Sequence, residues 1–195
     1  MKKTKTTIKK TKILDLNEAY NKTLLWFFSY PNREISLSDL SENLEVSKTT
    51  ANRVVNKLID EGFLKLEVLG KIWRISVNKD HIFNYSKKIG FNLQMLYESN
   101  IIEEIHKIIP NPKSLVLFGS YRKGDDTEES DIDLAVEITD NRELQILETK
   151  FKPYMGYRGE VPLKLHIFSR NKIDLNLFSN IANGIVIEGF LEVRP

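Results

Sequence analysis

The chain has 195 residues, of which 41% are hydrophobic and 29% charged, the composition of an ordinary globular protein rather than of a disordered or fibrous one. It has no cysteine, so disulfides, thiolate zinc sites and cysteine nucleophiles are excluded, and any metal must bind oxygen or histidine. No apolar run approaches the roughly 20 residues that cross a bilayer, and no secretory signal is evident. We therefore expect a cytoplasmic protein without a membrane partner.

The net charge of +2 is unevenly distributed along the chain. Basic residues exceed acidic ones by about five over residues 1–80, whereas acidic residues are in excess by about three over residues 81–195. The length and this asymmetry favour two small domains. Residues 1–13 are expected to form a basic tail that is solvated or, beside a DNA-binding fold, contacts phosphates.

Residues 14–78 show the pattern of three helices followed by a hairpin. Ser36 and Ser47 are suited to cap the second and third helices, and Leu69-Gly70-Lys71 suits the hairpin turn. Apolar residues at helical spacing predict the helices, and β-branched or alternating residues predict the strands. The expected helices cover residues 17–29, 36–46 and 48–61. The expected strands cover residues 63–68 and 72–77.

The central stretch Leu-Ser-Glu-Asn-Leu-Glu-Val-Ser-Lys-Thr-Thr-Ala-Asn-Arg resembles the winged helix-turn-helix family, and the resemblance covers residues 14–78. In that family the third helix enters the major groove of double-stranded DNA and the hairpin contacts the backbone. The resemblance assigns base contacts to Lys48, Thr49, Thr50, Asn52 and Arg53. It assigns phosphate contacts to Lys57, Lys71 and Arg74. Winged helices also serve as protein-docking modules, so this alternative stays open.

Residues 79–109 are expected to form a helical connector with a broad apolar face and a candidate break at Gly90. Pro110 and Pro112 follow and end it. Such a face packs either on its own domain or on a second copy in a homodimer.

Beyond the prolines, an apolar strand, Ser114 to Phe118, leads directly into Gly119 and Ser120. Glycine lets backbone N–H groups approach an anion closely, and the serine adds a hydroxyl donor. Phosphate groups are therefore expected at this turn, with Arg122 and Lys123 available for additional positive charge.

A second apolar strand, residues 131–136, contains Asp131 and Asp133. Alternate side chains of a strand point to the same face, so the two carboxylates project together. They repel each other unless a cation lies between them, and Mg²⁺ prefers one or two carboxylates together with water and substrate phosphates. The pattern predicts a site for a metal-bound nucleoside triphosphate.

The stretch Leu-Phe-Gly-Ser-Tyr-Arg-Lys-Gly-Asp-Asp-Thr-Glu-Glu-Ser-Asp-Ile-Asp-Leu resembles the signature of polymerase β-type nucleotidyltransferases. The resemblance is greatest to their minimal branch, over about residues 110–195. It implies transfer of a nucleoside monophosphate, such as AMP from ATP, to a hydroxyl with Mg²⁺ or Mn²⁺, and a role as antitoxin to a HEPN-type protein partner. The implied fold class is α+β, with a winged helix, a helical connector and a mixed sheet flanked by helices.

The family mechanism, as this resemblance implies, uses a third carboxylate on a neighbouring strand. The equivalent strand, residues 161–168, has no acidic residue on the relevant face, which holds Pro162, Lys164, His166 and Phe168. Three alternatives follow: Glu160 substitutes, His166 accepts the proton, or the site binds nucleotide without transferring it. The last would make the protein a DNA-binding regulator with a degenerate, nucleotide-sensing domain.

The remaining segments are expected to be architectural. The expected elements are helices over residues 142–150 and 174–183 and a closing strand over residues 185–193.

Overall fold

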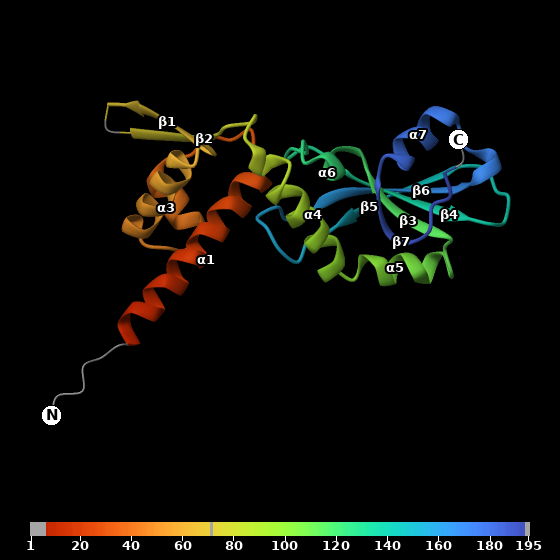
Figure 1. Cartoon of the computed structure of the whole chain (residues 1–195), viewed down its shortest axis with the longest axis horizontal. Helices are drawn as coiled ribbons and strands as arrows, with labels where there is room; N and C mark the ends of the chain where they lie inside the picture. The colour runs from red at the N-terminus through yellow and green to blue at the C-terminus, as the bar shows by residue number, and fades with distance from the viewer. Residues whose placement is uncertain (1–6, 71, 194–195) are drawn as a thin grey trace. The chain divides into compact units, whose positions relative to one another are not determined.

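The computed structural model describes residues 7–70 and 72–193 and divides the chain into two compact units, one ending at Ile82 and the other beginning at Phe83 (Figure 1). The first six residues of the expected basic tail lie outside the described residues. The helix expected from Asn17 instead begins at Thr7; the ten added residues contain no proline or glycine that would interrupt it. No helix in the described ranges is both long and apolar enough to cross a membrane.

The N-terminal unit contains three helices and a two-stranded hairpin, as expected for a winged helix. Its helices are α1 (Thr7–Ser29), α2 (Leu37–Asn43) and α3 (Lys48–Asp60). Its strands, β1 (Leu64–Leu69) and β2 (Ile72–Val77), pair antiparallel. Both predicted serine caps form, since Ser36 accepts a hydrogen bond from the Asp39 N–H and Ser47 from the Thr50 N–H. The apolar faces of these elements share a core that includes Phe27, Leu40, Val55, Leu58, Phe63 and Ile75.

The C-terminal unit is built on a five-stranded mixed sheet with the order β5-β6-β4-β3-β7. The strands are β3 (Ser114–Phe118), β4 (Ile132–Ile138), β5 (Gln145–Phe151), β6 (Val161–Ser169) and β7 (Ile185–Gly189). Only β4 and β6 run parallel to each other; the other pairs in this sheet are antiparallel. The mixed sheet expected for this domain is therefore confirmed.

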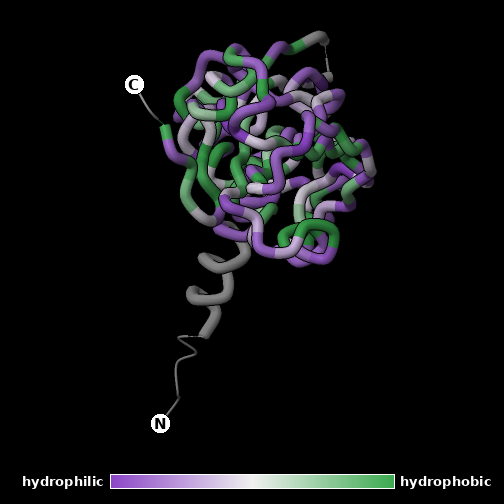
Figure 2. Tube along the Cα trace, turned by 90° about the vertical axis from the view of Figure 1, so that its right-hand side faces the viewer, coloured by the Kyte–Doolittle hydropathy of each residue, from purple (hydrophilic) through white to green (hydrophobic). Residues whose placement is uncertain are grey.

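Helices cover both faces of this sheet (Figure 1). The helices α4 (Lys87–Glu98) and α5 (Ile101–Ile108) pack on one face, where Met95 and Ile105 meet Leu117 and Leu134. On the other face lies α7 (Leu175–Ala182), whose Ile181 packs in a smaller cluster. The central strands β3 and β4 are almost wholly buried between these layers. Figure 2 shows how hydrophobic and hydrophilic residues are distributed along the chain. The apolar face of the connector is thus used within its own unit.

Three short elements remain, the first of which spans the boundary between the two units in the sequence. They are η1 (Ile82–Asn84), the short helix α6 (Gly119–Lys123) and η2 (Arg170–Lys172).

The expectation of a helix over residues 142–150 was wrong, because this region contains the strand β5. Leu147 and Phe151 lie on the same face of β5, which pairs along its whole length with β6. This pairing, rather than the local preference of the residues, decides the conformation. Other boundaries also differ. The connector was expected to be helical from residue 79, but apart from the short η1 its helix begins at Lys87, and it breaks at Ser99 and Asn100 instead of Gly90. The closing strand ends at Gly189.

Candidate functional site

The structure brings Asp131 and Asp133 together on the α7 face of the sheet. Asp131 directly precedes β4, and Asp133 is the second residue of that strand. The Asp131 Oδ2 atom lies 2.6 Å from Nζ of Lys164, and the Asp133 Oδ1 atom lies 3.2 Å from Nε2 of His166. Since Lys164 and His166 alternate along β6, all four side chains project from the same side.

Gly119, the first residue of α6 and directly after β3, lies against Asp133. Its φ is +71°, and a Cβ atom added there would lie 2.4 Å from Asp133 Oδ2. Only glycine satisfies both the left-handed conformation and this close approach. The turn predicted to receive phosphates is therefore adjacent to the carboxylate pair.

The other residues of the predicted phosphate site lie in α6. Ser120 is half-buried in its first turn, and Arg122 and Lys123 lie in its last turn. Within the described ranges, none of the three bonds to the carboxylates of the Asp131–Asp133 pair.

Lys164 sets the electrostatics of the pair. Its hydrogen bond to Asp131 lowers the pKa of that carboxyl below the ordinary value and raises the pKa of the lysine. Asp131 is accordingly a carboxylate at neutral pH. In the sheet Lys164 pairs with Asp133 of β4 on one side and with Glu148 of β5 on the other. The ammonium thus lies among acidic residues from two segments, the start of β4 and the strand β5.

His166 lies on the neighbouring strand, where the family resemblance implies a third carboxylate. The side chain is almost buried, and its ring packs edge-to-face on Phe118 with the centroids 5.0 Å apart. Nε2 faces Asp133, whereas Nδ1 is buried without a hydrogen-bond partner. The other candidate, Glu160, is paired with Lys150 at 3.1 Å, and both of these side chains are exposed.

Two buried polar side chains of α4, Lys88 and Asn92, hold the loop between α6 and β4. Lys88 Nζ lies 3.1 Å from Asp126 Oδ2, with only 2% and 4% of these side chains exposed. The Asn92 amide donates to Asp126 Oδ1 and to the carbonyl oxygen of Tyr121, both at 2.9 Å. Burial lowers the pKa of Lys88 and raises that of Asp126, so each charge depends on the other for compensation.

The same loop is held from the β5–β6 connection by Arg158. Its guanidinium donates to the carbonyl oxygens of Thr127 and Ser130 at 3.1 and 3.0 Å, and to the hydroxyl of Tyr121. Further support comes from Gly124, where a Cβ atom would lie 2.1 Å from the Asn84 carbonyl oxygen. The loop that precedes Asp131 is therefore fixed by contacts from distant parts of the sequence.

Two carboxylates on one face fit a hydrated divalent cation that arrives with phosphate oxygens as further ligands. In the described part of the chain, no three His, Asp or Glu side chains already converge as metal ligands would. The donor set fits one ion shared with a nucleotide and supplies no third carboxylate for a second ion.

Residues 99–188 match the family described as polymerase beta, nucleotidyltransferase, and residues 32–65 match the winged helix-turn-helix DNA-binding family. The chain joins a winged helix-turn-helix domain to a polymerase β-type nucleotidyltransferase domain. It is also similar to a protein of Methanocaldococcus jannaschii named "Putative protein adenylyltransferase", with 49% identity over 41 residues. That alignment covers 21% of this chain and 37% of the relative, so the chain spans little more than a third of the relative's length.

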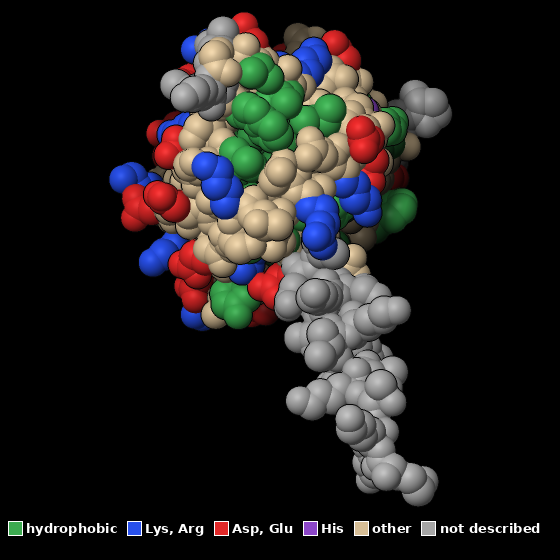
Figure 3. Space-filling model, turned by 90° about the vertical axis from the view of Figure 1, so that its left-hand side faces the viewer, with side chains coloured by type: hydrophobic (Ala, Val, Ile, Leu, Met, Phe, Trp, Pro, Cys, Tyr) green, Lys and Arg blue, Asp and Glu red, His purple; other side chains and the backbone are tan. Residues whose placement is uncertain are grey.

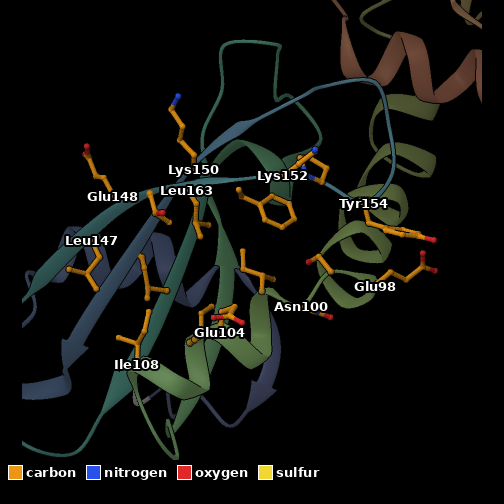
Figure 4. Close-up of a pocket in the computed structure, with 17 residues that line it drawn as sticks. Glu98, Asn100, Glu104, Ile108, Leu147, Glu148, Lys150, Lys152, Tyr154 and Leu163 are labelled. Carbon is orange, nitrogen blue, oxygen red and sulfur yellow. The ribbon is translucent and has the colours of Figure 1, made fainter.

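A hollow of about 950 Å³ lies on the opposite face of the nucleotidyltransferase sheet, between α5 and β5 (Figure 4). Leu163 and Leu165 line it, whereas Lys164 between them faces the carboxylate pair. Ile108 and Tyr154 lie toward its two ends (Figure 4). Its lining is mostly apolar, so the chemistry of the domain is assigned to the other face.

The residues of the winged-helix domain that were predicted to contact bases lie on or beside α3. Thr49 and Arg53 are exposed, and Arg53 forms no ion pair within the described ranges. The Lys48 ammonium donates to Ser38 Oγ at 2.8 Å, whereas Thr50 and Asn52 are half-buried.

The predicted phosphate contacts are more constrained. Lys57 pairs with Glu61, and Arg74 pairs with Glu34 and Glu67. Acidic and basic side chains are correspondingly interspersed on the face shown in Figure 3. Lys71 lies outside the described residues.

Proposed function

We propose that the nucleotidyltransferase domain transfers AMP from ATP to a hydroxyl group of a protein, with Mg²⁺ or Mn²⁺. The observation that carries this proposal is the pair Asp131 and Asp133 on one sheet face, with Asp133 against the backbone of Gly119. The name of the archaeal relative supports adenylyl as the group and protein as the acceptor.

Asp131 and Asp133 would hold the cation, and Gly119 and Ser120 would receive the phosphates. When bound, the cation supplies charge neutralisation at the triphosphate and at the departing pyrophosphate. Arg122, at the end of the same short helix, adds positive charge for the phosphates. In the transfer, the acceptor oxygen would form a bond to the α-phosphorus and release its proton to water, while the bond from that phosphorus to the pyrophosphate oxygen breaks and pyrophosphate leaves.

His166 orients Asp133 in this proposal. A hydrogen bond to a carboxylate requires an N–H at Nε2, which leaves the acceptor lone pair of a neutral ring on Nδ1. Because Nδ1 is buried, an incoming hydroxyl cannot reach it in this ring orientation. The geometry therefore favours a positioning role over direct removal of the hydroxyl proton.

The winged-helix domain is proposed to bind an operator through the exposed side of α3, with Arg53, which forms no ion pair with any described residue, among the contacts. We further propose that the protein is an antitoxin whose acceptor is a HEPN-type protein, on the basis of the resemblance to minimal nucleotidyltransferases. A homodimer stays a prediction, because the apolar face of the connector packs on its own sheet.

A second candidate function is favoured by the residues on β6. Lys164 and His166 lie beside the Asp pair, at the place where the family resemblance implies a catalytic carboxylate. In this alternative the domain binds nucleotide and reports it to the winged helix without transferring AMP.

Transfer from α-labelled ATP separates the two. The purified protein, with Mg²⁺ or Mn²⁺ and with the proteins encoded beside it as acceptors, should label a protein and release pyrophosphate. Asp131→Asn combined with Asp133→Asn should abolish the label, whereas Asp140→Asn, an exposed partner of Arg142, should not. Nucleotide binding without any transfer favours the second candidate, and absence of nucleotide binding excludes both.

A further inference from the structure

Lys164 was not among the residues predicted to form the site, yet its ammonium is the cation nearest to the carboxylate pair. Its Nζ lies 2.6 Å from Asp131 Oδ2, and 39% of its side chain is exposed, so both solvent and a ligand can reach it. Asp133 and Glu148 flank Lys164 in the sheet. The ammonium therefore already neutralises part of the negative charge that would attract a metal ion.

A metal ion arriving alone competes with this ammonium. To bind Asp131 it must displace Nζ from Oδ2, and the displaced positive charge then stays nearby on its four-carbon stem. Both effects weaken the binding of a free divalent cation.

A metal–triphosphate complex meets the opposite situation. The complex of ATP with one divalent cation carries net negative charge, so two bare carboxylates would repel it. An ammonium released from Asp131 lies beside the phosphates that accompany the metal, and phosphate oxygens are strong acceptors for such a donor. Lys164 then gains a hydrogen bond to a phosphate oxygen as it loses the one to Asp131.

We propose that Lys164 makes the binding of metal and nucleotide mutually dependent: its ammonium opposes the metal alone and binds phosphate when the two arrive together. Lys164 is thereby a specificity-determining residue for metal–triphosphate over free metal. This inference rests on the proposed function, since it assumes that Asp131 and Asp133 bind metal with a nucleoside triphosphate.

The test measures two dissociation constants on the full chain by electron paramagnetic resonance: that of Mn²⁺ alone, and that of Mn²⁺ with a non-hydrolysable ATP analogue. In Lys164→Met, Mn²⁺ alone should bind several-fold more tightly, whereas the analogue complex should bind about tenfold more weakly, as expected when a charge-assisted hydrogen bond is lost. These opposite changes cannot arise from general damage to the fold.

Lys150→Met is the matched control, because it removes the same charge and a similar ion pair, with Glu160 at 3.1 Å. It should change neither constant by more than about twofold, the range of an exposed pair. Lys164→Arg, which keeps the charge, should stay close to wild type. Unchanged or weaker binding of Mn²⁺ alone in Lys164→Met would overturn the inference, as would an unchanged constant for the analogue complex. Failure of the wild type to bind the analogue with Mn²⁺ would overturn the proposed function itself.

Discussion

Replacement of Gly119 by alanine would place a methyl group where the carboxylate of Asp133 now lies. The added Cβ atom would be 2.4 Å from Asp133 Oδ2 and 3.2 Å from its Cγ, so the carboxylate must turn away. The backbone would also hold alanine at a φ of +71°, which costs about 1–2 kcal/mol. Loss of the hydrogen bond between Asp133 and His166 adds about 1 kcal/mol.

The free energy of unfolding of the nucleotidyltransferase domain should therefore fall by about 2–3 kcal/mol, the sum of these costs. Displacement of a metal-binding carboxylate should lower AMP transfer by about 100-fold, as a misplacement of roughly 1 Å in an active site can do. Stability is measured by urea unfolding with circular dichroism. Both tryptophans, Trp26 and Trp73, lie in the winged-helix unit, so their fluorescence is an internal control that should not change.

Gly90→Ala is the matched control for this change. Gly90 lies inside α4 without a positive φ, and an added Cβ atom would meet nothing within 4 Å. Alanine should therefore stabilise the helix by about 0.5–1 kcal/mol and leave transfer unchanged. If Gly119→Ala kept wild-type transfer and stability, the proposed contact between the phosphate-binding turn and Asp133 would be refuted.

Four further outcomes are expected. Lys88→Met leaves the Asp126 carboxylate buried without its partner and should destabilise the domain by about 3–5 kcal/mol in urea unfolding. Asp131 has a lowered pKa in the folded state, so it stabilises the fold above its ordinary pKa, and this contribution is lost as pH falls through the lowered value. Asp131→Asn should therefore reduce the loss of stability on acidification, measured by unfolding at a series of acidic pH values. His166→Asp supplies a third carboxylate and should retain or increase labelled AMP transfer. Arg53→Ala should weaken binding to the specific DNA site by about 1–3 kcal/mol and reduce the preference for that site over unrelated DNA, measured by fluorescence anisotropy.

Each of these has a contradicting result. A Lys88→Met protein as stable as wild type would show that the buried pair is not needed to hold the loop. Equal acid sensitivity in Asp131→Asn would assign the loss of stability to other groups. Transfer lost in His166→Asp but kept in His166→Ala would exclude a carboxylate at this position. Unchanged affinity and sequence preference in Arg53→Ala would remove Arg53 from the DNA interface.

The carboxylate pair was predictable because its signal is local. A strand, a glycine and two aspartates at alternate positions lie within about twenty residues, and alternation alone places Asp131 and Asp133 on one face. The serine caps of α2 and α3 were predictable for the same reason. These features depend on neighbours in the chain.

The support of the site depends on residues far apart in the chain. Lys88 lies 38 residues before Asp126, and no periodicity connects the two. The strand β5 forms through its pairing with β6. The local pattern instead predicts a helix over this segment, so it gives no reason to expect Glu148 beside Lys164. Such relations appear only once the sheet order is known.

The parallel pairing of β4 with β6 has a consequence for how errors in folding are rejected. Because side chains alternate, a slip of β6 by one residue would turn Lys164 and His166 into the apolar layer beneath α4 and α5 and expose Leu163 and Leu165 instead. An ammonium without a partner in that layer would be strongly unfavourable. A misregistered sheet is therefore less stable than the native one, because of the same alternation that places Lys164 and His166 beside the Asp pair. A chain that reaches its most stable state already has these groups in position.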